Sequence, residues 1–181
     1  MDDYKIVFTG PVGAGKTTAI SSVSDIAPMK TEQLPTDETR KRKSSTTVAM
    51  DYGIFNVEGK RRIHLYGTPG QERFNFMWDI LSKGGKGLVL LVDNADANPF
   101  EKMRFYLDAF AEFIEKTRVV IGVTRMDLSA YPRIDDYHEV LGQSGLKTAV
   151  FDVDARVKQD VSLLVQSLVY SISVGKSQER K

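Results

Sequence analysis

Residues 10–17 read Gly-Pro-Val-Gly-Ala-Gly-Lys-Thr, and this stretch decides the fold. It follows a short apolar run, Tyr4–Thr9, and opens a segment, residues 16–26, whose apolar side chains have helical spacing. The pattern is that of a phosphate-binding loop, in which glycines let backbone N–H groups face a polyphosphate. In this pattern Lys16 reaches the β- and γ-phosphates, and the Thr17 hydroxyl binds Mg²⁺. The stretch therefore predicts a nucleoside triphosphate and magnesium as ligands, with a glycine-rich turn as the alternative.

Apolar runs and segments of helical period alternate along the rest of the chain. The strands that we expect are residues 4–9, 47–57, 62–66, 87–93, 118–124 and 147–153, with a turn at 58–60. Asn98 and Pro99 predict the cap and first turn of a helix that continues to residue 114, and Asp160 opens the last helix. Residues 27–46 are polar and show no period. This order predicts an α/β fold: a six-stranded, mostly parallel sheet with helices on both faces.

The composition excludes several classes of protein. The 181 residues are 41% hydrophobic and 27% charged, which is globular, and the net charge of +1 argues against a protein that coats nucleic acid. There is no cysteine for a disulfide, a thiolate metal site or a lipid anchor. The longest apolar run, Leu88–Val92, is far shorter than a membrane span. We expect a cytoplasmic protein without a stable membrane anchor, with one domain over residues 1–174 and a short polar tail over 175–181.

A second motif gives a family resemblance. Residues 67–74 read Gly-Thr-Pro-Gly-Gln-Glu-Arg-Phe directly after the third expected strand. Together with residues 10–17 they resemble the Ras-like small GTPases, whose second switch reads D-x-x-G-Q-E-R-F. Thr47 stands where that family has the magnesium-binding threonine of its first switch. Residues 124–127 (Thr-Arg-Met-Asp) stand in the place of N-K-x-D, and residues 154–156 (Asp-Ala-Arg) in the place of S-A-K.

The resemblance implies a P-loop G domain, with the strands in the order 2-3-1-4-5-6 and one antiparallel edge pair, and a role for each motif residue. The cofactors implied are GTP or GDP with Mg²⁺. Gln71 would orient the attacking water, Asp127 would accept hydrogen bonds from guanine N1–H and its 2-amino group, and the Ala155 N–H would bond guanine O6. The implied catalytic residues are Gln71, Lys16 and Thr47, and the implied metal ligands are Thr17 and Thr47. The implied nucleotide-binding residues are Gly10, Val12, Gly13, Ala14, Gly15, Lys16, Thr17, Thr18, Thr47, Gly70, Thr124, Arg125, Asp127, Asp154, Ala155 and Arg156.

Three positions depart from the family pattern. Gly67 replaces the aspartate that holds magnesium through water, so the metal is expected to rely on Thr17, Thr47, phosphate oxygens and water. Thr124 replaces an asparagine and is expected to lose a brace on the P-loop. Val12 replaces a glycine, and its side chain either crowds the route of a partner's arginine or is simply tolerated. The G-T-P-G-Q sequence resembles a prokaryotic branch that includes the gliding and cell-polarity regulators of bacteria.

The resulting functional hypothesis is a GTP-binding switch with slow hydrolysis. It implies a protein effector and a GTPase-activating partner, for which a roadblock-type protein is one candidate, and no nucleic-acid partner. The basic run Arg40–Lys43 is either a solvated charge run or a source of a catalytic arginine. Trp78 is open to a core role or to a partner. A GTP-binding adaptor with negligible hydrolysis and a P-loop ATPase or phosphotransferase remain as alternatives.

Overall fold

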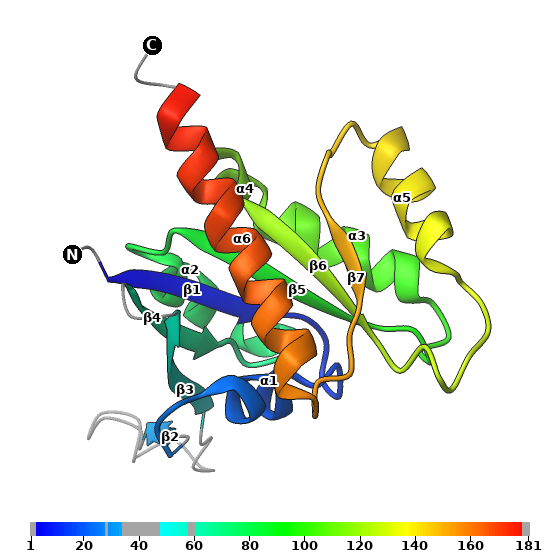
Figure 1. Cartoon of the computed structure of the whole chain (residues 1–181). Coiled ribbons are helices and arrows are strands. Elements are labelled where there is room, and N and C mark those ends of the chain that lie inside the picture. The colour runs from blue at the N-terminus through cyan, green and yellow to red at the C-terminus, as the bar shows by residue number, and fades with distance from the viewer. Residues whose placement is uncertain (1–2, 28, 34–47, 58–60, 179–181) are drawn as a thin grey trace.

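One mixed sheet forms the centre of the molecule. In a computed structural model of the chain, the described residues are 3–27, 29–33, 48–57 and 61–178. Within them the strands are β1 (Tyr4–Thr9), β2 (Met29–Gln33), β3 (Val48–Val57), β4 (Arg61–Gly67), β5 (Gly87–Asp93), β6 (Val119–Thr124) and β7 (Val150–Asp152). Their order is β2-β3-β4-β1-β5-β6-β7 (Figure 1). The strands from β4 to β7 in this order run parallel, and β3 is antiparallel to both of its neighbours.

Helices cover both faces of the sheet. On one face α1 (Lys16–Val23) and α6 (Lys158–Gln178) pack together, and α6 crosses the front of the sheet in Figure 1. The core on this face joins Ile20 of α1 and Leu164 of α6 to β1 residues such as Phe8. The core on the other face includes side chains from α2 (Asn75–Ser82), α3 (Pro99–Ala109) and α5 (Ile134–Gln143). The predicted two-sided α/β architecture is therefore confirmed.

The six predicted strands are present in the predicted order, but the one expected over 147–153 is confined to Val150–Asp152. The sheet also contains one strand more, so two antiparallel pairs lie at its edge instead of the expected one. Residues 27–46 were expected to lack regular structure, and this is wrong for Met29–Gln33, which form β2. Its sequence, M-K-T-E-Q, has no apolar alternation by which to recognise a strand. The strand pairs through its backbone with β3 at the edge of the sheet, where a strand needs no two-sided apolar pattern. The expected turn at 58–60 lies outside the described residues.

Three helices differ from their predicted bounds. The last one, α6, begins at Lys158 instead of Asp160 and continues to Gln178, within the segment expected as a polar tail. The helix expected over 98–114 is divided into α3 and α4 (Ala111–Lys116), because Phe110 leaves helical geometry with φ −105° and ψ 13°. Pro99 begins α3 as predicted, but the Asn98 side chain makes no capping hydrogen bond. The helix expected over 16–26 ends at Val23, since Ser24 turns to extended backbone and its hydroxyl accepts the Ile54 N–H. No helix in the described part of the chain is both long and apolar enough to cross a bilayer.

Candidate nucleotide-binding site

The loop between β1 and α1 has the backbone of a phosphate cradle. Gly10, Gly13 and Gly15 all have positive φ, which places the loop in a conformation that other residues rarely adopt. A side chain on Gly10 would overlap the Leu91 carbonyl oxygen of β5, so the loop lies directly against the sheet. Glycine at these three positions gives the curled backbone that phosphate-binding loops have before a helix, and the Ala14 N–H closes a turn of it by donating to the Pro11 carbonyl oxygen over 3.2 Å.

Lys16 is held beneath this loop. Its ammonium donates to the carbonyl oxygens of Gly10, at 2.5 Å, and Pro11, at 2.8 Å, and only 8% of the residue is exposed. Burial lowers the pKa of Lys16 to about 8, while the negative charge of Asp51 acts in the opposite direction. The structure thus places the buried ammonium of Lys16 at the end of the loop where phosphate would bind.

Thr17 contacts a residue that the sequence motifs did not indicate. Its hydroxyl donates to Asp51 Oδ2 over 2.5 Å, and Asp51 lies in the middle of β3. Thr47, the other expected metal ligand, is outside the described residues. Asp51 belongs to no linear motif, and the only available signal was its pairing in the sheet. The antiparallel register places Asp51 opposite Gly67, the position where the family pattern has aspartate.

The loop after β4 is held against the P-loop. A Cβ on Gly70 would lie 2.7 Å from both Lys16 Nζ and the Val12 nitrogen, so only glycine fits this approach. The Tyr106 hydroxyl donates to the Gly70 carbonyl oxygen over 2.9 Å, and Trp78 Nε1 donates to the Pro69 carbonyl oxygen over 3.0 Å. Trp78 is 4% exposed, stacks on the Phe110 ring and packs at a tilt against the Tyr106 ring, which resolves its role in favour of the core.

Two adjoining hollows form the cleft beside these loops. The base-side hollow, of about 790 Å³, lies at the ends of β6 and β7. It is lined by Gly13, Ala14, Gly15, Thr18, Thr124, Arg125, Met126, Asp127, Leu128, Asp152, Val153, Asp154, Ala155, Arg156 and Asp160. The phosphate-side hollow, of about 400 Å³, is lined by Val12, Gly13, Gly15, Lys16, Thr17, Thr18, Asp51, Thr68, Pro69, Gly70 and Arg125. Four shared residues make the two hollows continuous.

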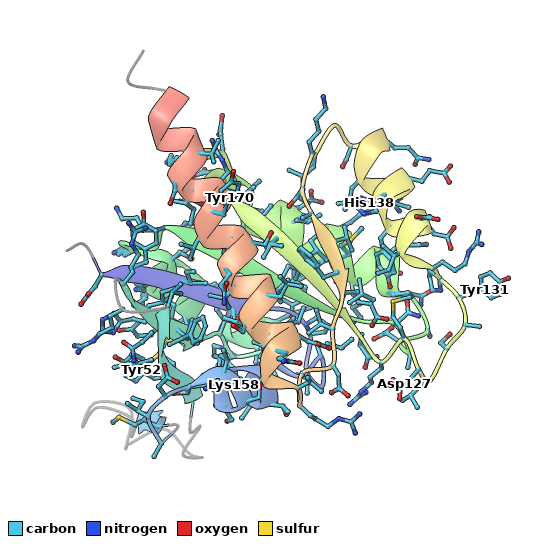
Figure 2. All side chains as sticks on the ribbon, viewed as in Figure 1. Tyr52, Asp127, Tyr131, His138, Lys158 and Tyr170 are labelled. Atoms are coloured by element: carbon cyan, nitrogen blue, oxygen red, sulfur yellow. The ribbon has the colours of Figure 1, made fainter. Side chains whose placement is uncertain are left out.

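Nearly all of the expected nucleotide-binding residues therefore meet in one cleft. Asp127 follows β6 and lies at the lower right of the molecule in Figure 2. Gly10 takes part through its carbonyl oxygen, which holds Lys16. Gln71 is exposed and lies beside the cleft, in a third hollow that Val12 and Gly70 also line.

Thr124 braces the P-loop, contrary to the expectation that replacing asparagine would lose this contact. Its hydroxyl lies 3.0 Å from the Ala14 carbonyl oxygen and 3.2 Å from that of Val92, and it can donate to either. A hydroxyl on a residue buried at the strand end can reach the same loop that a longer amide would reach. Beside it, Arg125 pairs with the buried Asp93 at 2.7 Å, which fixes the wall between the two hollows.

The loop at residues 154–156 is shaped by its own polar groups. Asp154 accepts the Arg156 N–H and two guanidinium hydrogen bonds, which lower the pKa of Asp154 to about 2. The Asp154 N–H donates to Asp160 Oδ2 in the first turn of α6. Ala155 is buried, and its N–H has no hydrogen-bond partner among the described residues. Burial and the neighbouring carboxylates of Asp160, Asp127 and Asp154 raise the pKa of Asp152.

Comparison with known proteins gives the family. Residues 27–177 match a family model described as a conserved hypothetical ATP binding protein. The chain belongs to this family. The matched range begins after residues 10–17, so the P-loop of this family member is identified from its own sequence and backbone.

Similar individual proteins match between about half and nearly all of the chain. The Ras-related protein RabC of Dictyostelium discoideum is 23% identical over 177 residues, which cover 93% of this chain and 83% of that protein. The Ras-related protein Rab-10 of Diplobatis ommata is 28% identical over 149 residues, covering 81% and 66%. An uncharacterised protein of Methanocaldococcus jannaschii is 32% identical over 93 residues, covering 51% and 52%. The chain is thus a small-GTPase-like P-loop protein and a distant homologue of the Ras-related proteins.

Proposed function

We propose that this protein is a guanine-nucleotide switch that binds GTP with Mg²⁺ and hydrolyses it slowly to GDP and phosphate. The observation that carries the proposal is the presence of Asp127 in the same hollow as the Ala155 backbone and the P-loop. A carboxylate accepts from both N1–H and the 2-amino group of guanine, whereas adenine leaves that acceptor without this pair of donors. The Ala155 N–H, for which the described part of the chain offers no partner, would donate to guanine O6 in the same hollow.

The residues of the phosphate side suit hydrolysis. Lys16 and the P-loop N–H groups would bind the β- and γ-phosphates, and Gly70 would sense the γ-phosphate through its N–H. The oxygen donors of the phosphate side fit Mg²⁺, with Thr17 and Thr47 proposed as ligands; when bound, the metal neutralises charge on the phosphates. Gln71, beside the cleft, would orient the water. Transition-state charge needs further stabilisation, so we expect a partner to accelerate the reaction.

The sequence Gly67-Thr-Pro-Gly-Gln supports a place in the prokaryotic branch of the small GTPases. We therefore propose a cytoplasmic role in bacterial signalling, including cell polarity or motility. An effector would read the γ-phosphate-bound state, and a roadblock-type protein is a candidate for the partner that stimulates hydrolysis.

Two further functions have a specific observation in their favour. The family description names ATP, which favours a P-loop ATPase or phosphotransferase. Gly67 and Val12, in place of the family's usual aspartate and glycine, favour a GTP-binding adaptor that scarcely hydrolyses.

A competition experiment separates these functions. Purified protein loaded with fluorescent mant-GDP is challenged with GTP, ATP and XTP, and single-turnover hydrolysis is then followed. We expect GTP to compete best, and Asp127→Asn to shift the preference toward XTP, while Asp108→Asn on the exposed side of α3 changes nothing. If ATP competes as well as GTP, the phosphotransferase alternative is favoured; tight GTP binding without turnover indicates the adaptor.

A further inference from the structure

Among the described residues, the phosphate-side hollow contains one carboxylate, and it comes from a strand that the sequence motifs did not indicate. Asp51 is the one acidic residue that lines this hollow within residues 3–27, 29–33, 48–57 and 61–178. The other carboxylate at a neighbouring strand end, Asp93, is occupied by its ion pair with Arg125. Asp51 instead faces Thr17, whose hydroxyl donates to it over 2.5 Å.

P-loop nucleotide-binding proteins hold magnesium between two fixed protein groups, the hydroxyl of the P-loop Ser or Thr and a strand-borne aspartate. Mg²⁺ takes few protein ligands, completes its shell with water and phosphate oxygens, and is commonly held by one or two carboxylates. The hydroxyl is present here as Thr17, but Gly67 has no side chain to offer as the aspartate. The Asp51 carboxylate, which accepts the Thr17 hydroxyl in the same hollow, stands where the missing aspartate would be needed.

The sheet register explains how Asp51 reaches this place. Asp51 of β3 is paired with Gly67 of β4 across the antiparallel ladder. A Cβ on residue 67 would lie 3.1 Å from Asp51 Cβ and 3.2 Å from Asp51 Oδ2, so the Asp51 side chain fills the space that a residue-67 side chain would enter. Gly67 on β4 has no side chain, and this leaves the room that the Asp51 carboxylate on β3 occupies.

We infer that Asp51 is the carboxylate of the magnesium site, supplied by β3 in place of an aspartate at position 67. This inference rests on the proposed binding of a nucleotide with Mg²⁺. Asp51 acts on the metal or on its bound water, and its role is distinct from that of Lys16, which acts on phosphate directly. In the absence of magnesium the Asp51 charge opposes phosphate binding; with magnesium the charge supports it.

The test measures release of mant-GDP while Mg²⁺ is titrated from excess EDTA to millimolar concentration. For Asp51→Asn we expect unchanged or slower release in EDTA, and at least a tenfold rise in the Mg²⁺ concentration needed to slow release by half. Asp108→Asn, the same charge change on the exposed side of α3, should reproduce the wild-type titration. A purely structural role for Asp51 would speed release equally with and without Mg²⁺, and that result would overturn the inference.

A double variant that moves the carboxylate from position 51 to position 67 gives a second test. Combining Asp51→Gly with Gly67→Asp removes the two Asp51 atoms that crowd the new side chain, leaving Ile20 Cδ1 at 3.1 Å from its Cβ. The double variant should regain the magnesium response that Asp51→Gly alone loses. An Asp51→Asn titration identical to wild type overturns the inference while the nucleotide function stands. Wild-type protein that binds neither mant-GDP nor mant-ADP overturns both.

Discussion

The hydroxyl of Thr124, the last residue of β6, donates to the Ala14 carbonyl oxygen over 3.0 Å. This hydrogen bond joins the end of β6 to the P-loop, although the two residues are 110 positions apart in the sequence. Thr124→Val keeps the shape of the side chain but removes its donor. We expect the variant to lose about 1–3 kcal/mol of unfolding free energy, because a buried carbonyl loses its partner. Thr124→Ser, which keeps the hydroxyl, should stay close to wild type. Urea unfolding measures both, and equal stability of the two variants would contradict the bracing role.

The buried ammonium of Lys16 predicts a pH dependence. The pKa of Lys16 is about 8 in the folded protein, below the ordinary value of 10.5. Between these values the unfolded chain binds more protons, so the stability of the nucleotide-free protein should rise with pH over that range. Bound phosphate favours the charged form, so nucleotide affinity should fall above about pH 8, by up to roughly tenfold per pH unit.

Calorimetry in two buffers of different ionisation enthalpy measures this proton uptake on binding. Lys16→Ala should abolish triphosphate binding. Asp51→Asn, measured without Mg²⁺, should move the fall in affinity to lower pH, since the Asp51 charge raises the Lys16 pKa. An affinity that stays flat beyond pH 9 would show that Lys16 is not the titrating group.

Tyr106 controls the loop at Gly70 through a single hydrogen bond. Tyr106→Phe keeps the buried ring and removes the donor, at a cost of about 1 kcal/mol. We expect faster amide hydrogen exchange over residues 68–74, measured by mass spectrometry. The control is Tyr137→Phe, an equally buried tyrosine whose hydroxyl donates to Asn94 instead. Equal exchange in the two variants would mean that the ring, rather than the hydroxyl, holds the loop.

Gln71 is expected to act on the reaction and hardly on binding. Gln71→Leu should leave GTP affinity within a few-fold and slow single-turnover hydrolysis, because it removes a group that orients water. The neighbouring exposed Glu72→Gln serves as a control. Unchanged hydrolysis in Gln71→Leu would mean that another residue acts in the reaction. Arg40 and Arg42, which lie outside the described residues, would be the next candidates.

Val12 lies at the rim of the phosphate side and is 67% exposed. If the protein supplies its own arginine, Val12→Gly should leave partner-stimulated turnover unchanged, and Arg40→Ala or Arg42→Ala should remove the stimulation. This is the outcome that we expect, since an arginine can act in cis. Turnover of the three variants with and without partner decides it, and a large gain in Val12→Gly would indicate an arginine inserted by the partner.

The sequence predicts those parts of the fold that depend on local pattern. The buried run Gly87–Asp93 and the P-loop before α1 have the expected structure, because apolar side chains and glycine spacing report directly on burial and turn geometry. Strand β2 lacks such a signal, since its pairing with β3 uses backbone groups that every residue carries. The break at Phe110 leaves the apolar spacing intact, so the pattern does not show it.

The candidate site likewise contains some residues that the sequence predicts and others that it does not. Asp127 and Ala155 belong to motifs at strand ends, and parallel strands bring those ends to one edge of the sheet. Asp51 lies mid-strand, and its place beside Thr17 depends on the β3–β4 register, which a linear motif does not encode. The Thr124 brace was missed because the family pattern names a residue type, while the structure requires only a donor within reach of Ala14.

The close pairing of Asp51 with Gly67 also constrains how this family can diverge. A Cβ at position 67 would lie about 3.1 Å from Asp51 Cβ, so a second carboxylate there would require its neighbour to shift by a few tenths of an ångström and would add like-charge repulsion. Stepwise mutation from one arrangement to the other must pass through a protein that has a carboxylate at neither position 51 nor position 67, or one at both. We expect an alignment of relatives to separate into two lineages, acid on β3 with glycine on β4 or the reverse, with intermediates selected against.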